Sequence, residues 1–208
     1  MPIKAVIFDM GGVLLRTTDH TPREQLSKEL GITRCELERI VFASDSSLLA
    51  ETGQISEAQH WDHVLDRLNI PQEQRQEFQR KFWSKDRVDD DLIDYIRKLR
   101  ACYRTGLLSN AWDGIRPALH MRFPHMLDVF DVVMFSAEVG MRKPDARYYH
   151  WILEILGVAA EEAIFVDDYP LNVEAAKQIG IKAVQFLDPE QTRREISELL
   201  NHKTGRKG

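Results

Sequence analysis

Short apolar runs recur along this chain, and longer segments with a different periodicity separate them. The first run, residues 5–8, is continuously apolar, which is typical of a strand buried on both faces of a parallel sheet. Strands that alternate with helical segments predict an α/β fold, built as a Rossmann-like, doubly wound and mostly parallel sheet. The later runs occupy residues 106–108, 132–135, 163–166 and 182–186.

Helical periodicity is clearest between the later runs, where apolar residues repeat every three or four positions. A further segment, residues 172–179, is rich in helix-forming residues and is followed by Gly180, a residue typical of helix C-termini. The two periodic sets are Leu92, Ile93, Ile96 and Leu99, and Tyr148, Ile152 and Ile155.

One long segment, from about Thr18 to Arg87, breaks the alternation because it contains no convincing strand pattern. Within it, Thr33 stands three residues before a glutamate and Ser56 three residues before a glutamine, which are start signals of helices. We therefore predict an α/β core formed by residues 1–17 and 88–208, interrupted by an all-α helical cap at 18–87. The predicted cap helices lie at 22–30, 34–42, 56–68 and 72–83.

Composition and charge narrow the function classes for this chain of 208 residues. Its 33 acidic and 28 basic residues give a net charge of −5, which argues against a nucleic-acid partner. Cys35 and Cys102 have neither the number nor the spacing of a disulfide framework or a metal site. No apolar run approaches the length of about 18 residues that a membrane span requires. We expect a soluble protein of the reducing cytoplasm, whose oligomeric state the sequence leaves open.

Polar residues follow the predicted strands directly, at the edge where ligands bind in such sheets. Among them Asp9, Asp167 and Asp168 offer the hard oxygen ligands that Mg²⁺ prefers in proteins. The residues at this edge are Asp9, Ser109, Asn110, Ser136, Glu138, Asp167 and Asp168.

Four segments carry these and further candidates in chain order. They read VIFDMGGV at 6–13, LLSN at 107–110, RKPD at 142–145 and FVDDYPLNVEAAKQIG at 165–180. In this order they resemble the four motifs of the haloacid dehalogenase-like hydrolase superfamily. The resemblance spans essentially the whole predicted core, and the helical insert lies where that family places an all-α cap.

The resemblance implies a Mg²⁺-dependent phosphomonoester hydrolase that acts on a small phosphorylated metabolite, such as a sugar phosphate. Asp9 would be the nucleophile that forms an aspartyl-phosphate, which divides the transfer into two steps. Ser109 and the region of Asn110 would bind and orient the phosphoryl group. Lys143 would neutralise its charge.

The same resemblance implies the metal ligands and the backbone groups that approach phosphate. Asp9, the carbonyl of Gly11 and Asp168 would hold Mg²⁺, with Asp167 close behind them or acting through water. Gly11 and Gly12 would let the backbone N–H groups of their turn approach the phosphate without interference from a Cβ.

Position 11 also departs from the family pattern, because phosphatases of the family usually carry a second aspartate there as general acid and base. Such catalysis is typically worth about 10²–10⁴-fold in rate. Family members with the pattern D-x-G-G/N-V nevertheless resemble sugar-phosphate phosphatases, so glycine does not exclude activity. Asp19 is a candidate replacement for the proton donor.

Two other functions stay open from the sequence. A 2-haloacid dehalogenase resembles this family but attacks carbon and needs no metal; the adjacent Asp167 and Asp168 argue against it, since like charges so close favour a cation. The glycine at position 11 motivates the second alternative, a binding or regulatory module that kept the fold and lost turnover.

Several neighbouring residues are expected to serve the structure. Glu138 is expected to form an ion pair with the Lys143 loop, and Asn172 to cap the helix at 173–179 or to contact the ligand. Four residues that could bind a ligand are instead expected to pack in the interior or face solvent: His60, His63, Trp83 and Trp112.

Overall fold

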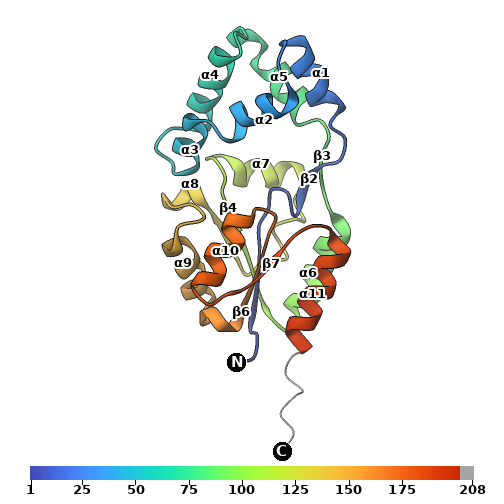
Figure 1. Cartoon of the computed structure of the whole chain (residues 1–208), viewed down its shortest axis with the longest axis vertical. Coiled ribbons are helices and arrows are strands. Elements are labelled where there is room, and N and C mark those ends of the chain that lie inside the picture. The colour runs from blue at the N-terminus through green and yellow to red at the C-terminus, as the bar shows by residue number, and fades with distance from the viewer. Residues whose placement is uncertain (202–208) are drawn as a thin grey trace, which may run out of the picture.

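The structure, a computed structural model, describes residues 1–201, so the last part of the predicted core, 202–208, lies outside the described residues. Its centre is a five-stranded sheet in the order β5-β4-β1-β6-β7, in which every neighbouring pair is parallel. This confirms the predicted α/β class and each predicted strand (Figure 1). The strands are β1 (Ala5–Phe8), β4 (Arg104–Ser109), β5 (Val132–Phe135), β6 (Ala163–Asp167) and β7 (Lys182–Gln185).

Strand β1 lies in the middle of the sheet, between β4 and β6, and all four of its residues are buried. Its last residue, Phe8, is in register with Leu107 of β4 and Val166 of β6. The chain that leaves these three strands therefore emerges at one edge of the sheet, and the polar residues that follow them are brought together.

Helices cover both faces of the sheet, as a doubly wound fold requires. One apolar cluster packs residues of α6, α7 and α11 against one face, and a second packs α9 and α10 against the other. No helix among residues 1–201 has the length and apolar character needed to cross a bilayer. The helices are α6 (Asp90–Arg100), α7 (Ile115–Arg122), α8 (Ser136–Val139), α9 (Ala146–Leu156), α10 (Pro170–Gln178) and α11 (Pro189–Asn201), with a short 3-10 helix at Ala160–Glu162.

A separate helical unit, formed by α1–α5, lies over the edge of the sheet at which β1 ends (Figure 1). It has its own apolar interior, in which Trp61 and Phe82 are the largest fully buried side chains. The predicted start signals are confirmed: Thr33 accepts a hydrogen bond from the Glu36 N–H, and Ser56 and Gln59 form a reciprocal capping box. The helices are α1 (Thr21–Glu29), α2 (Arg34–Phe42), α3 (Asp45–Glu51), α4 (Glu57–Arg67) and α5 (Arg75–Phe82), with a 3-10 turn at Gln72–Gln74.

The prediction that no strand lies between 18 and 87 is wrong at the end of that segment. The short strand β3 (Asp86–Val88) pairs antiparallel with β2 (Leu15–Thr17), and the two connect the helical unit to the α/β unit. Both strands are short and polar, so they lack the apolar pattern on which the prediction relied. Helix α3 was missed for the same reason, since it has little apolar periodicity.

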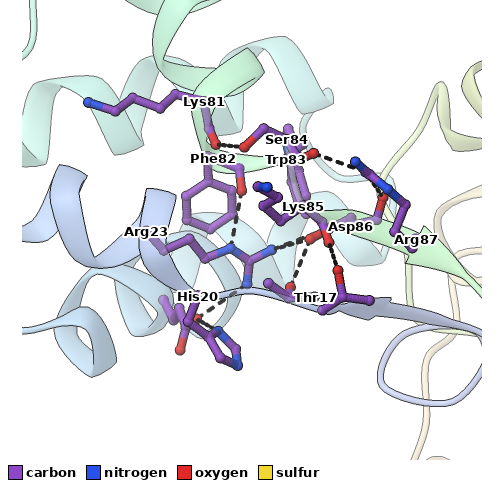
Figure 2. Close-up of polar contacts among 12 residues, drawn as sticks. Thr17, His20, Arg23, Lys81, Phe82, Trp83, Ser84, Lys85, Asp86 and Arg87 are labelled. Carbon is purple, nitrogen blue, oxygen red and sulfur yellow. Dashed lines mark hydrogen bonds and ion pairs between the residues drawn. The ribbon is translucent and has the colours of Figure 1, made fainter.

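A buried ion pair ties the two connecting strands to the helical unit (Figure 2). Asp86 accepts hydrogen bonds from the Thr17 hydroxyl at 2.7 Å and from Nη2 of Arg23 at 2.9 Å. Arg23 also donates from Nε to the Phe82 carbonyl at 3.2 Å, at the end of α5. Both charged side chains are almost fully buried, so Asp86 depends on Arg23 for its compensation, while Arg23 has a second counter-charge in Glu38 at 3.3 Å.

Removing one partner of this pair should therefore destabilise the protein strongly. We expect Asp86→Ala to lower the free energy of unfolding by about 3 kcal/mol, the lower end for a broken buried ion pair, because it removes the nearer counter-charge of the buried Arg23 guanidinium and leaves Glu38 at 3.3 Å. Urea denaturation followed by circular dichroism measures the change.

The matched control is Glu29→Ala, which removes the exposed ion pair with Lys81 in the same unit. An exposed pair contributes less than about 1 kcal/mol. Equal losses of stability in the two variants would show that the Arg23–Asp86 pair has no special role.

Candidate active site

The ammonium of Lys143 lies at the centre of the polar residues that meet at the sheet edge. Its Nζ is 2.6 Å from Oδ1 of Asp9 and 2.6 Å from Oδ2 of Asp167, and the side chain is 1% exposed. Burial alone would lower the pKa of Lys143, but the charges and hydrogen bonds of Asp9 and Asp167 raise it above its ordinary value. The lysine is therefore held as a cation between the ends of β1 and β6.

Asp9 is the buried carboxylate that directly follows β1. Burial raises its pKa to about 7, with a further contribution from the negative charge of Asp167, while Lys143 opposes both effects. A cation placed beside this carboxylate would lower that pKa and keep the group ionised at neutral pH.

Three carboxylates, those of Asp9, Asp167 and Asp168, have oxygen atoms within 4.8 Å of one another. Asp167 is fully buried and already engaged, since it accepts hydrogen bonds from Lys143, from the Tyr169 N–H at 2.8 Å and from Asn172 at 3.1 Å. Asp168 is exposed and receives none of these bonds. The donor set fits a hard divalent cation, and it favours Asp9 and Asp168 as its nearer ligands.

The turn after Asp9 packs against this cluster. Gly12 has a φ of 78°, a left-handed conformation that favours glycine, and a Cβ there would overlap the Asp168 carboxylate in its present position. Its N–H donates to the Leu15 carbonyl at 3.0 Å, which differs from the predicted role as a donor to phosphate. Gly11 is exposed and lies outside the left-handed region, and a Cβ at this position would have no neighbour within 4 Å.

Ser109 and Asn110 lie at the end of β4, as the sequence predicts, but their contacts differ. The Ser109 hydroxyl makes only a long bond of 3.4 Å to the Asn110 carbonyl, so it is available to a ligand. The Asn110 side chain is reciprocally bonded to the backbone N–H and carbonyl of Lys143, at 2.8 and 3.0 Å. Asn110 thus fixes the lysine loop.

Two buried tyrosines support the site from α9, a role that helical periodicity does not indicate. The Tyr148 hydroxyl donates to the carbonyls of Ser109 and Met134, at 3.1 and 3.0 Å. The Tyr149 hydroxyl donates to the Asn172 carbonyl at 2.9 Å. The hydroxyl of a buried tyrosine usually forms a hydrogen bond. Two tyrosines within an apolar helical pattern could therefore have indicated that their hydroxyls bind polar groups in the interior.

Two expectations about supporting residues are wrong. Glu138 forms its ion pair with Arg116 at 2.7 Å and not with the Lys143 loop. Asn172 does not cap its helix, because α10 begins at Pro170 and the Asn172 side chain points to Asp167. The partner of Glu138 comes from helix α7, and the partner of Asn172 is the last residue of strand β6.

The helical unit contacts the α/β unit beside the site. Glu51 of α3 accepts a hydrogen bond from Nε of Arg142 at 2.6 Å, next to Lys143 in the chain. The Trp112 ring, from the loop after β4, lies 4.4 Å from the His60 ring, and its Nε1 donates to Ser47 at 3.2 Å. These contacts hold the helical unit against two loops of the site.

The remaining candidates lie in packing or at the surface. His60 is fully buried within the helical unit, where burial lowers its pKa to about 4, so the expectation that it serves packing is confirmed. Asp19 is partly exposed, and hydrogen bonds from Thr21, together with Lys85 at 3.5 Å, lower its pKa. A carboxyl in this state is ionised at neutral pH and holds no proton to donate.

Comparison with known proteins gives an independent view of the chain. A family model described as haloacid dehalogenase-like hydrolase matches residues 3–180. A sesquiterpene phosphatase from Aspergillus oryzae is 29% identical over 200 residues, which cover 95% of this chain and 96% of the relative. A D-ribitol-5-phosphate phosphatase from Bacteroides thetaiotaomicron is 25% identical over 209 residues, which cover 96% and 99%.

Solved structures agree with this result. A HAD family enzyme from Bacteroides thetaiotaomicron, in complex with magnesium and inorganic phosphate, has a TM-score of 0.72 at 25% identity, covering 88% of this chain and 93% of that one. An L-2-haloacid dehalogenase from Xanthobacter autotrophicus shares the fold, with a TM-score of 0.67 at 21% identity, covering 94% and 83%. Since the family match includes the whole helical unit and four of the five sheet strands, this chain belongs to the haloacid dehalogenase-like hydrolases.

Proposed function

We propose that this hydrolase is a Mg²⁺-dependent phosphatase that acts on a small organic phosphate through an aspartyl-phosphate on Asp9. The observation that carries the proposal is the buried Lys143 ammonium between Asp9 and Asp167, with the carboxylate of Asp168 beside them. The two phosphatase relatives, each matched over nearly its full length, support the same reaction class.

In this proposal Asp9 attacks phosphorus. Lys143 holds one carboxylate oxygen, Oδ1, so the carboxylate is oriented before the substrate arrives. The Ser109 hydroxyl donates to an oxygen of the phosphoryl group. To do so it gives up only its long bond of 3.4 Å to the Asn110 carbonyl. The lysine ammonium stabilises the negative charge that the transferred group carries.

The charge at the site supports a metal ion. When Asp9 is ionised to act as a nucleophile, three carboxylates against one ammonium leave two negative charges, which would repel a phosphate dianion. Asp9, Asp168 and the Gly11 carbonyl would hold Mg²⁺, and Asp167 would orient Lys143. When bound, the ion neutralises charge on the phosphoryl group and on Asp9.

We further propose that the helical unit, with boundaries near residues 18 and 87, is a cap domain that closes over the substrate. Its contacts through Glu51 and Trp112 reach the two loops that carry Lys143 and Ser109. A cap in this place excludes water and contacts the part of the substrate beyond the phosphate. A phosphorylated metabolite such as a sugar phosphate, and a cytoplasmic location, fit this proposal.

Magnesium should stabilise the folded protein, because the ion binds a site that the unfolded chain lacks. In metal-free buffer, saturating MgCl₂ should raise the melting temperature, since ligand at 100 times its dissociation constant adds about 2.7 kcal/mol. Asp168→Asn should remove most of this shift, while the exposed Asp128→Asn should keep it. A full shift in Asp168→Asn would contradict the assignment of this ligand.

The pKa of Asp9 predicts a pH dependence of stability in metal-free buffer. Because the pKa is raised from 3.8 to about 7 in the folded state, ionisation of Asp9 costs stability as the pH rises through this range. Asp9→Asn should therefore melt at a higher temperature than the wild type at pH 8. At pH 3.5 the two proteins should differ little, and a difference that is the same at both values would show that Asp9 is not the group responsible.

Phosphatase activity itself is tested on a panel of phosphorylated metabolites, by release of inorganic phosphate. We expect turnover with Mg²⁺, loss of turnover with EDTA, and a decrease of more than about 1,000-fold in Asp9→Asn. Asp128→Asn should retain wild-type rates. Chloride release from a 2-haloacid without metal would instead identify a dehalogenase, and no turnover on any substrate would identify a binding module.

A further inference from the structure

The turn that follows Asp9 leaves open space at Gly11. Gly11 follows Asp9 by two residues, and its neighbour Gly12 packs directly against Asp168, so the turn borders the reacting groups. A Cβ on Gly11 would meet nothing within 4 Å, and its backbone conformation is open to any residue. The space that a proton-donating side chain would fill at this turn is therefore open.

Besides Asp9 and Asp168, which are the proposed nucleophile and metal ligand, four carboxyl groups are engaged by hydrogen bonds or ion pairs. Asp167 accepts bonds from Lys143 and Asn172, and Glu51 is paired with Arg142 at 2.6 Å. Glu138 is paired with Arg116 at 2.7 Å, and Asp19 is held by Thr21 and Lys85. None of these four acids, among the residues that the structure describes, is placed to give a proton to a departing alcohol.

The other groups with a proton are also committed. The hydroxyls of Tyr148 and Tyr149 donate to backbone carbonyls from buried positions, and burial raises the pKa of both. His60 lies inside the helical unit, with its Nε2 at 3.0 Å from the Val41 carbonyl. Lys143 is fixed by two carboxylates, whose charges make the loss of its proton unfavourable.

The lack of a donor among these residues has a direct chemical consequence for the first step. A bond forms between an Asp9 oxygen and phosphorus, and the bond from phosphorus to the ester oxygen breaks with its electron pair on that oxygen. The leaving group thus departs as an anion and takes a proton from water afterwards. Its stability as an anion then controls the rate of this step, because no acid removes the developing charge.

The second step does not depend on the leaving group. Water attacks phosphorus, the bond to Asp9 breaks, and its electron pair returns to the carboxylate while the proton of the water passes to solvent. This step is common to every substrate. Discrimination between substrates therefore appears in kcat/KM, which reports the steps up to the first irreversible one, and it appears in kcat only for esters whose first step is slower than the second.

We infer, on the basis of the proposed phosphatase function, that this enzyme selects phosphates with a leaving group that is stable as an anion. Acyl, aryl, enol and anomeric sugar phosphates belong to this class, whereas phosphates of simple primary alcohols do not. The selection arises from the glycine at position 11 and from the engaged acids around it.

The test measures kcat/KM with Mg²⁺ for a series of aryl and alkyl phosphates with leaving groups of graded acidity. For the wild type we expect kcat/KM to rise steeply with the acidity of the leaving group. A rapid burst of phenol release should precede the steady state for the aryl phosphates, because the second step is slower and shared.

Gly11→Asp adds a carboxyl group in the open space. We expect it to raise the ratio of alkyl to aryl kcat/KM by about 10²-fold, the lower range for general acid catalysis. Gly11→Asn adds a side chain of the same size without an acidic proton, so the ratio in Gly11→Asp is compared with the ratio in Gly11→Asn. Melting temperatures with Mg²⁺ verify that both variants fold.

The outcomes separate the inference from the function on which it rests. Hydrolysis of both ester classes with similar kcat/KM in the wild type overturns the inference and leaves the phosphatase proposal intact. If kcat/KM is insensitive to the leaving group in the wild type but rises steeply with its acidity in Glu51→Gln, then Glu51 of the helical unit is the proton donor. This result also overturns the inference. No hydrolysis of any ester, aryl phosphates included, overturns the phosphatase proposal itself. The dependence of the wild-type kcat/KM on the acidity of the leaving group tests the inference even if Gly11→Asp is unstable.

Discussion

The burial of a single ammonium group, that of Lys143, constrains most of this structure. A buried cation is tolerated only when counter-charges and hydrogen bonds surround it, and here Asp9 and Asp167 supply them. These residues end two adjacent strands, while the lysine comes from a loop that Asn110 holds through its backbone. The order of the strands, the length of the loop and the position of the lysine are therefore fixed together.

The same constraint explains why an acidic chain can accept an anionic substrate. One lysine cannot neutralise three carboxylates, so in the proposed function a further cation is needed before the site becomes attractive to phosphate. Gly12 lets the turn after Asp9 approach Asp168 closely, which keeps the carboxylates near one another. The net charge of −5 is thus compatible with the proposed reaction, because the local balance of charge decides binding.

The sequence was sufficient for the sheet and for the residues at its edge, because continuous apolar runs mark strands and polar residues mark their ends. It was insufficient wherever a polar residue is buried by a distant partner. Asp86 lies in a strand that no apolar pattern reveals, because Arg23 compensates its burial. The partners of Glu138 and Asn172 were wrong for a related reason, since short-range spacing does not show which strand ends and helices become neighbours in three dimensions.

Two ion pairs contribute to the attachment of the helical unit in different ways. The Arg23–Asp86 pair is buried where the connecting strands meet the unit, so breaking it leaves the buried Asp86 carboxylate without its counter-charge, and the attachment there is firm. In the Glu51–Arg142 pair the Arg142 side chain is 33% exposed, so water can solvate that guanidinium when the pair breaks, at a lower cost than in the buried pair. A movement of the helical unit would therefore break the second pair and keep the first. Because Arg142 precedes Lys143 in the chain, such a movement would shift the loop that holds the ammonium, and the proposed closure of the unit would then change the charge that the substrate meets.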